Sequence, residues 1–237
     1  MEQKVILITG ASGGMGGALA ALFSSENTKL ALQHNKNEIN LAESESVAHF
    51  QADLTNESEV ERLVSSVLEK FGRIDVLINN AGISKSSMSW KTDAASWRET
   101  LAINLDAPFF MSKHVIPTFR QQNSGRIINI SSIVAQTGFI GTSAYAASKA
   151  GLIGLTKTLS KELSNFGVTV NALALGYFNV GMIDDVPKEL QEEIISSIPL
   201  QKLGDPSSVF QTINWLISEE GGYVTGQTIN LNGGLFL

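Results

Sequence analysis

The stretch Val5-Ile-Leu-Ile-Thr-Gly-Ala-Ser-Gly-Gly-Met-Gly16 decides the fold of this chain. It joins a short apolar run, typical of a buried strand, to a glycine-rich turn that opens an apolar helix. Gly10, Gly14 and Gly16 let the backbone turn sharply and let a bound group approach the main chain. The free N–H groups and the dipole at a helix start attract anions such as a pyrophosphate. The order strand, turn and helix therefore predicts a dinucleotide-binding unit, although such a turn in isolation is also compatible with a purely structural connection.

The rest of the chain continues this alternation of strand and helix. Short apolar runs predict strands at residues 5–9, 30–33, 47–51, 76–79, 127–131, 169–175 and 228–231. Longer amphipathic segments predict helices at residues 15–24, 57–71, 94–120, 144–165 and 206–218. Continuous apolar runs are typical of parallel strands that are covered on both faces. We therefore expect an α/β fold with a Rossmann-type, doubly wound parallel sheet of about seven strands in three α/β/α layers.

The connections carry more local predictions. Residues 36–46 are few and polar, so we expect the helix between the second and third strands to be shortened. We expect Thr55 to cap the next helix and Pro206, after Asp205, to take a first helical position. Residues 177–203 form a long excursion with an amphipathic piece at 187–196, and such excursions often cover active sites. Because no linker or repeat interrupts the pattern, we expect one domain over residues 1–237.

Composition excludes several classes of function. The net charge of −6 argues against nucleic acid as the main partner, because phosphate binding needs concentrated Lys and Arg. The absence of cysteine excludes disulfides and thiol nucleophiles, and the scattered His34, His49 and His114 lack the spacing of metal ligands. The first apolar run is too short to span a membrane and lacks the features of a signal peptide. We expect a cytoplasmic protein without a metal or a membrane partner.

Tyr145 and Lys149 are the first candidates for catalysis. They lie four residues apart in a predicted helix, so both side chains share one helix face. A phenol has a pKa of about 10, and a neighbouring ammonium lowers that pKa towards the range of a general acid or base. This spacing also occurs by chance on helix surfaces. Ser132, at the end of a predicted strand, offers a hydroxyl for a carbonyl oxygen, and Asn104 lies within a long predicted helix.

Together, these segments resemble the short-chain dehydrogenase/reductase family over essentially the whole chain, and its 3-oxoacyl-[acyl-carrier-protein] reductases most of all. The matching pieces are the loop at 9–16, Asp53, residues 79–82, Asn104, the set Ser132, Tyr145 and Lys149, and the stretch 224–234. The resemblance implies that Tyr145 donates a proton to a carbonyl oxygen while hydride moves from nicotinamide C4 to the carbonyl carbon. It implies that Lys149 binds the ribose hydroxyls and lowers the pKa of Tyr145, that Ser132 orients the carbonyl, and that Asn104 holds a relay water.

The resemblance also implies contacts with the cofactor. Asn80 and Gly82 are expected along the adenosine ribose and Asp53 at the adenine ring, although Asn79 and Asn80 can equally end a strand and Asp53 can equally belong to a turn. The expected cofactor contacts are Gly10, Ser12, Gly14, Met15, Gly16, Asn35, Lys36, Asp53, Leu54, Asn80, Ala81, Gly82, Tyr145, Lys149, Gly176 and Phe178.

The end of the second strand indicates which dinucleotide is preferred. Relatives that prefer NAD carry an acidic residue there, whereas this chain reads Leu-Gln-His34-Asn35-Lys36. No carboxylate repels a 2′-phosphate, and Asn35 and Lys36 can bind one, so we expect NADP(H) in preference to NAD(H). Two features depart from this pattern. Gly13 replaces the basic residue that many NADP-binding relatives have in the loop, and Lys36 can equally be a solvated charge.

Two further departures lie after the sixth strand. Leu175 replaces the family's proline, and Val180 replaces a threonine that binds the nicotinamide carboxamide. Since the side chain of Val180 cannot form a hydrogen bond, we expect backbone groups near it to bind the carboxamide.

The substrate is indicated only by class. With Ser132, the residues Val134, Gln136, Phe139, Tyr177, Phe178 and Met182 are expected to form a mostly apolar rim, suited to an acyl chain or a flat ring; some can equally belong to the core of the excursion. We expect reduction of 3-oxoacyl thioesters of acyl carrier protein or CoA. Asn123 and Phe166, however, occupy positions where basic residues for an acidic carrier protein are expected.

The alternatives are an alcohol dehydrogenase of the same family that acts on a sugar, a steroid or a polyol, and a non-catalytic dinucleotide sensor. Small residues along the Tyr145 helix and the apolar tail 235–237 predict a homotetramer, with a dimer as the alternative.

Overall fold

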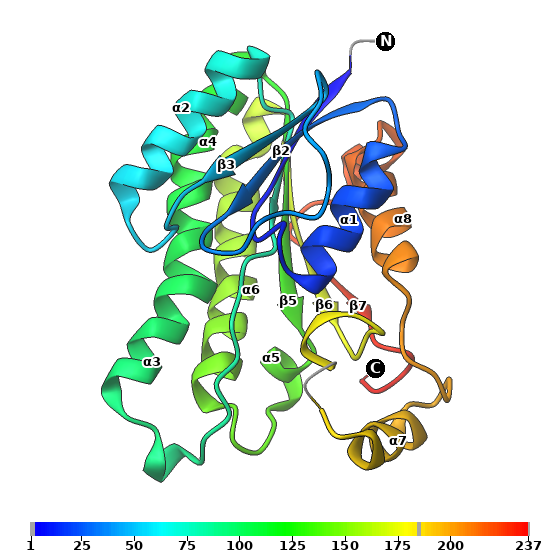
Figure 1. Cartoon of the computed structure of the whole chain (residues 1–237). Helices are drawn as coiled ribbons and strands as arrows, with labels where there is room; N and C mark the ends of the chain where they lie inside the picture. Colours follow the sequence, from blue (N-terminus) through cyan, green and yellow to red (C-terminus); the bar gives the residue numbers. More distant parts are fainter. Residues whose placement is uncertain (1–2, 184–185, 237) are drawn as a thin grey trace.

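The chain folds around one parallel sheet, shown in Figure 1, and the computed structural model describes residues 3–183 and 186–236. The strands are β1 (Lys4–Ile8), β2 (Thr28–His34), β3 (Val47–Gln51), β4 (Val76–Asn79), β5 (Gly125–Ser132), β6 (Val168–Leu175) and β7 (Thr228–Leu231). They lie in the order β3-β2-β1-β4-β5-β6-β7, and every neighbouring pair is parallel. The predicted seven-stranded, doubly wound sheet is confirmed.

Helices cover both faces of this sheet. They are α1 (Gly14–Ser24), α2 (Glu57–Phe71), α3 (Ala94–Leu101), α4 (Ala107–Gln122), α5 (Val134–Thr137), α6 (Ser143–Leu163), α7 (Lys188–Ser197) and α8 (Pro206–Ile217). Figure 1 shows α1 and α8 on one face and α2, α4 and α6 on the other. Within the described residues, no helix has the length and apolar character needed to cross a membrane.

Successive side chains along a strand alternate between two hydrophobic clusters, one on each face of the sheet. Ile6 and Ile8 of β1 pack in the cluster that contains residues of α1 and α8. Val5 and Leu7 pack in the cluster that contains residues of α2, α4 and α6. All four side chains are fully buried, which explains why β1 reads as a continuous apolar run.

Two helix predictions were wrong. The structure has no helix between β2 and β3; Ile39 and Leu41 in this connection pack against the α1 side of the core instead. The single helix predicted over residues 94–120 is divided into α3 and α4 by a π-helical turn at Ala102–Asp106.

The helix starts also differ in detail. Asn56, not Thr55, caps α2: its side chain accepts a hydrogen bond from the Ser58 N–H. Thr55 is instead bonded to Asp53, whose Oδ1 accepts from both the N–H and the hydroxyl of Thr55. The start of α8 matches the prediction, because Asp205 is its cap and Pro206 its first residue.

The excursion over residues 177–203 carries a short 3₁₀ turn (Gly181–Ile183) and α7. Residues 184 and 185 within it, and Leu237 of the apolar tail, lie outside the described residues. Beyond the carboxyl ends of β5 and β6, Figure 1 shows α5 on one side and the excursion with α7 on the other.

Candidate active site

The predicted site residues gather where the order of the sheet reverses. β1 pairs with β2 on one side and with β4 on the other, so the connections that follow β1 and β4 diverge. In doubly wound sheets this switch point leaves a crevice at the carboxyl ends of the strands, where ligands bind. The glycine-rich loop follows β1 at this point, and Asn80 to Gly82 follow β4.

Close backbone packing requires two of the loop glycines. Gly10 has a φ of +65°, and a Cβ on it would lie 2.8 Å from the Cα of Ala81. A Cβ on Gly14 would lie 2.4 Å from both the N and the Cα of Gly181, at the start of the 3₁₀ turn. The loop after β1 therefore touches the loop after β4 and the excursion after β6, and any side chain at these positions would force them apart.

The start of α1 is suited to an anion. Its cap, Gly13, supplies no side-chain hydrogen bond, and the first turn contains no acidic residue. The first N–H groups of a helix lack intrahelical acceptors and carry the positive end of the dipole. Met15 and Gly16 lie in this turn, as expected for residues that meet a pyrophosphate.

Gln33, which the sequence analysis did not identify, ties the glycine loop to the sheet. The side chain is 2% exposed; its Oε1 accepts from the Gly10 N–H at 2.8 Å, and its Nε2 donates to the Ala52 carbonyl at 2.8 Å. A polar residue within the apolar run of β2 was the available signal, because a buried amide needs partners for both ends.

Asn80 has a similar supporting contact. Its Nδ2 donates to the carbonyls of Thr9 and Gly10 at 2.9 and 3.2 Å, while the Thr9 hydroxyl accepts from the N–H groups of Asn80 and Ala81. The side chain of Asn80 thus fixes the loop after β1 against the loop after β4. Part of its hydrogen-bonding capacity is used within the protein.

Ser132, Tyr145 and Lys149 come together at the end of β5 and the start of α6. Ser132 is the last residue of β5, and Tyr145 and Lys149 lie in the first two turns of α6. The Nζ of Lys149 lies 5.8 Å from the centre of the Tyr145 ring and donates to the Ile130 carbonyl at 2.7 Å. The Ser132 side chain forms a hydrogen bond with Tyr145. The arrangement places a hydroxyl, a phenol and an ammonium next to one another.

Burial changes the pKa of both ionisable groups. Desolvation raises the pKa of Tyr145 above its ordinary value, and the hydrogen bond with Ser132 offsets part of this rise. Desolvation lowers the pKa of Lys149 to about 8, because the residue is 4% exposed and its ammonium has no carboxylate partner within the described residues. The expected lowering of the Tyr145 pKa by Lys149 is not seen: burial raises this pKa, and only the hydrogen bond with Ser132 opposes the rise.

Asn104 lies at the centre of the π-helical turn. Its Oδ1 accepts from the Ile83 N–H at 2.9 Å, and its Nδ2 donates to the Ile83 carbonyl at 2.9 Å and to the Ser148 hydroxyl at 3.1 Å. Both amide hydrogens are therefore occupied. A π-turn shifts the register of the backbone hydrogen bonds. The main-chain carbonyl of Asn104 is therefore the group of this residue that suits a relay water.

The predicted substrate rim is mixed in character. Phe139 and Met182 are 62% and 53% exposed, and Val134 and Tyr177 are partly buried. Gln136 is exposed, and its Nε2 donates to Asn230 of β7 at 2.7 Å.

The structure also shows the burial of four other predicted positions, which follow β2 and β6. Phe178 is buried in the core cluster that contains residues of α1 and α8, so only its backbone can reach a ligand. Val180 packs against the same cluster. Asn35 and Lys36 are exposed after β2.

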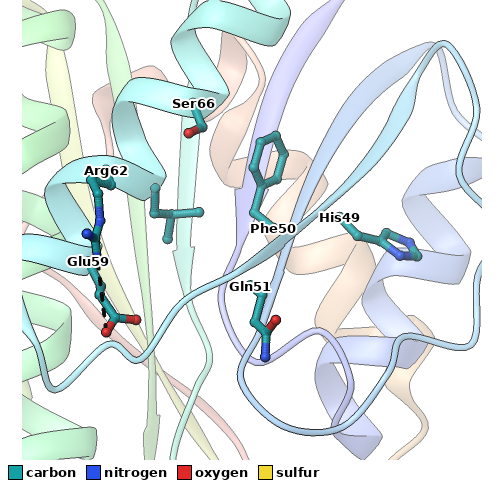
Figure 2. Close-up of a pocket in the computed structure, with 7 residues that line it drawn as sticks. His49, Phe50, Gln51, Glu59, Arg62 and Ser66 are labelled. Carbon is teal, nitrogen blue, oxygen red and sulfur yellow. Dashed lines mark ion pairs between the residues drawn. The ribbon is translucent and has the colours of Figure 1, made fainter.

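A pocket at the outer edge of the sheet is separate from this site. Figure 2 shows its lining side chains, which come from β3 and α2 and include His49, Phe50 and the pair Glu59 and Arg62. Arg62 and Glu59 are 4.0 Å apart, and the Arg62 side chain is 74% exposed. None of the lining residues belongs to the predicted catalytic set.

Comparisons with known proteins identify the family of the chain. The family model described as short chain dehydrogenase matches residues 4–191. The chain is 38% identical to the 3-oxoacyl-[acyl-carrier-protein] reductase FabG of Thermotoga maritima, covering 100% of this chain and 99% of the relative. It is 34% identical to the enzyme of the same name from Vibrio cholerae, with coverage of 100% and 99%, and 36% identical to nodulation protein G of Azospirillum brasilense, with coverage of 99% of each chain. The chain belongs to the short-chain dehydrogenase family of oxidoreductases.

Proposed function

We propose that this chain is an NADPH-dependent reductase that converts 3-oxoacyl thioesters into 3-hydroxyacyl thioesters. The observation that carries the proposal is the juxtaposition of Ser132, Tyr145 and Lys149 at the carboxyl edge of the sheet, the edge at which the glycine-rich loop also lies. Relatives named 3-oxoacyl-[acyl-carrier-protein] reductase, aligned over the full chain, support the substrate class.

The residues present fit a nicotinamide dinucleotide. The uncapped start of α1 and the close backbone approach at Gly10 and Gly14 suit a pyrophosphate. Lys149 has three donor hydrogens and gives one to Ile130, so it has others for ribose hydroxyls. The end of β2 carries His34, Asn35 and Lys36 and no carboxylate, which supports NADP(H) over NAD(H). When bound, the reduced cofactor supplies a hydride to the carbonyl carbon of the substrate.

The chain's own residues manage the proton. The Ser132 hydroxyl donates to the carbonyl oxygen of the substrate and orients it. The Tyr145 phenol gives its proton to that oxygen, so that one hydride and one proton convert the ketone into a secondary alcohol. Lys149 then returns a proton to the phenolate, and a water at the Asn104 carbonyl supplies Lys149 from solvent. The raised pKa of Tyr145 suits this direction, because the phenol remains protonated at neutral pH.

The partners follow from the same reaction. We propose acyl carrier protein as the carrier, because relatives named 3-oxoacyl-[acyl-carrier-protein] reductase align over the full chain. We also propose a cytoplasmic homotetramer. A sedimentation experiment that found only monomer would contradict the assembly.

The direct test uses purified protein, NADPH or NADH, and a short 3-oxoacyl thioester, with the absorbance of the reduced cofactor as the signal. We expect turnover with NADPH, and Tyr145→Phe should abolish it while leaving NADPH binding largely intact. Turnover with a sugar or a steroid but with no 3-oxoacyl thioester would overturn the substrate assignment. Wild-type rates in the Tyr145→Phe variant would overturn the catalytic assignment.

A further inference from the structure

Ser148 lies between two parts of the site without being placed to touch a substrate. It is fully buried, and its Oγ donates to the Tyr145 carbonyl at 2.7 Å. The same oxygen accepts from Asn104 Nδ2 at 3.1 Å. One hydroxyl therefore connects the π-turn at Asn104 to the turn of α6 that carries Tyr145 and Lys149.

The position of the Asn104 side chain is tightly constrained. The Asn104 amide is also bonded to both the N–H and the carbonyl of Ile83, so its position is fixed from the loop after β4 and from α6. The space it borders is narrow: a Cβ on Gly82 would lie 3.2 Å from Asn104 Oδ1 and 3.4 Å from Lys149 Nζ. A shift of a few tenths of an ångström at Asn104 therefore changes the surroundings of the Lys149 ammonium.

We infer that Ser148 is a positioning residue for the proton relay. It sets the placement of the Asn104 carbonyl relative to Lys149 and Tyr145, and this role rests on the proposed function. Without the hydroxyl, one Asn104 N–H is left buried and unpaired, which is unfavourable enough to make the amide move or admit water. The relay would then lose its alignment although every catalytic side chain is still present.

The chain offers a matched control on the same helix. Thr156 is also fully buried; its Oγ1 donates to the Leu152 carbonyl at 2.8 Å and accepts from Asn129 Nδ2 at 2.9 Å. The bonding pattern is that of Ser148, two helical turns further along α6. Thr156→Val and Ser148→Ala each remove one hydroxyl and leave one buried asparagine N–H unpaired. Both variants should lose similar stability, so only an effect specific to the site separates them.

The experiment compares the two variants by steady-state kinetics over a range of pH. We expect kcat of Ser148→Ala to fall about ten- to a hundredfold, in line with the effect of small misplacements in active sites, with KM for NADPH nearly unchanged. The alkaline limb of its pH–rate profile should shift, whereas Thr156→Val should keep the wild-type kcat and profile. Ser148→Cys, which keeps a weak donor and acceptor, should recover part of kcat and also serves if Ser148→Ala folds poorly.

A second measurement does not depend on turnover. Hydrogen exchange at the Ile83 amide, which donates to Asn104 Oδ1, should accelerate in Ser148→Ala and stay unchanged in Thr156→Val. Equal kcat, pH profile and Ile83 exchange in the two variants would overturn the inference. If the wild-type protein reduced no carbonyl compound, the proposed function would fail, and the exchange at Ile83 would still decide whether Ser148 positions Asn104.

Discussion

Lys149, on which the proposed mechanism depends, is expected to make the folded protein less stable. Burial lowers the pKa of Lys149 from 10.5 to about 8. Each unit of pKa corresponds to about 1.4 kcal/mol, so keeping this lysine charged in the folded state costs about 3 kcal/mol of stability at pH 7. Replacing it by the unbranched apolar side chain in Lys149→Met removes this cost. The change also leaves the Ile130 carbonyl without its Nζ partner, which destabilises the variant by about 1 kcal/mol and offsets part of the gain.

The pH dependence separates this effect from ordinary repacking. Between pH 8 and 10.5 the folded protein releases the Lys149 proton while the unfolded chain still holds it. Because the unfolded state binds more protons there, the stability of the wild type rises with pH across this window, by about 3 kcal/mol in total. Lys149→Met lacks this rise. The difference in unfolding free energy between the two proteins should therefore favour the variant at pH 7 and decline towards pH 10.5.

Urea unfolding followed by tryptophan fluorescence measures this difference, with both proteins at one fixed concentration because oligomers make stability concentration-dependent. Burial raises the pKa of Tyr145 above its ordinary value, so the folded protein keeps this phenol protonated over most of the window. A difference that stays flat from pH 7 to 10.5 would refute the claim that Lys149 is charged and buried at a cost. The variant should also be inactive, because substitutions that stabilise an active site commonly reduce its activity.

Two further predictions concern the cofactor loop. Gly14→Ala should weaken NADPH binding in a fluorescence titration and lower Tm, because its Cβ would lie 2.4 Å from Gly181 backbone atoms. The control Gly17→Ala should stabilise α1 by about 0.5–1 kcal/mol, because its Cβ meets nothing nearer than the Ala11 carbonyl at 3.4 Å. Equal effects of the two variants would contradict the packing argument. Gln33→Leu should cost about 2 kcal/mol in urea unfolding and raise KM for NADPH, because the buried Gly10 N–H and Ala52 carbonyl lose their partners; an unchanged KM would show that this bond does not shape the loop.

The parts of the fold that depend on local patterns were predictable from the sequence. β1 and β6 are buried on both faces, so their sequences are continuous apolar runs, and the glycine-rich turn follows β1 directly. The structure also brings together Ser132, Tyr145 and Lys149, which the sequence places at the end of one strand and on one face of the following long helix. These features need no knowledge of partners far away in the chain.

The features that were missed depend on specific hydrogen-bond partners, some nearby and some far away in the chain. Whether Thr55 or Asn56 caps α2 is decided by Asp53, which binds the Thr55 hydroxyl and leaves Asn56 to accept from Ser58. The π-turn at Asn104 is accompanied by contacts of its side chain with Ile83, 21 residues earlier, and with Ser148, 44 residues later.

Buried polar residues inside apolar strands were the clearest overlooked signal. Asn79 Nδ2 donates to Asn129 at 2.8 Å, and Asn129 donates in turn to Thr156 of α6, so a buried polar chain joins β4 and β5 to the part of α6 beyond Tyr145 and Lys149. Burial of an amide on an otherwise apolar strand face is unfavourable unless a hydrogen-bond partner is present there. The same reasoning applies to Gln33. Such residues indicate where the sheet is bonded to an element that carries function.

The electrostatics of the site also bear on the direction of the reaction. Burial disfavours charge on both groups: it keeps Tyr145 as a neutral phenol and brings the pKa of Lys149 down to about 8. Near neutral pH the site therefore holds a proton on Tyr145 and a second one on Lys149 that is released more readily than usual. In the proposed reaction, reduction of a carbonyl consumes a proton from Tyr145, which Lys149 then replaces. Oxidation of an alcohol would need the phenolate first, which burial opposes, so the pKa shifts of the two residues favour the proposed direction, reduction.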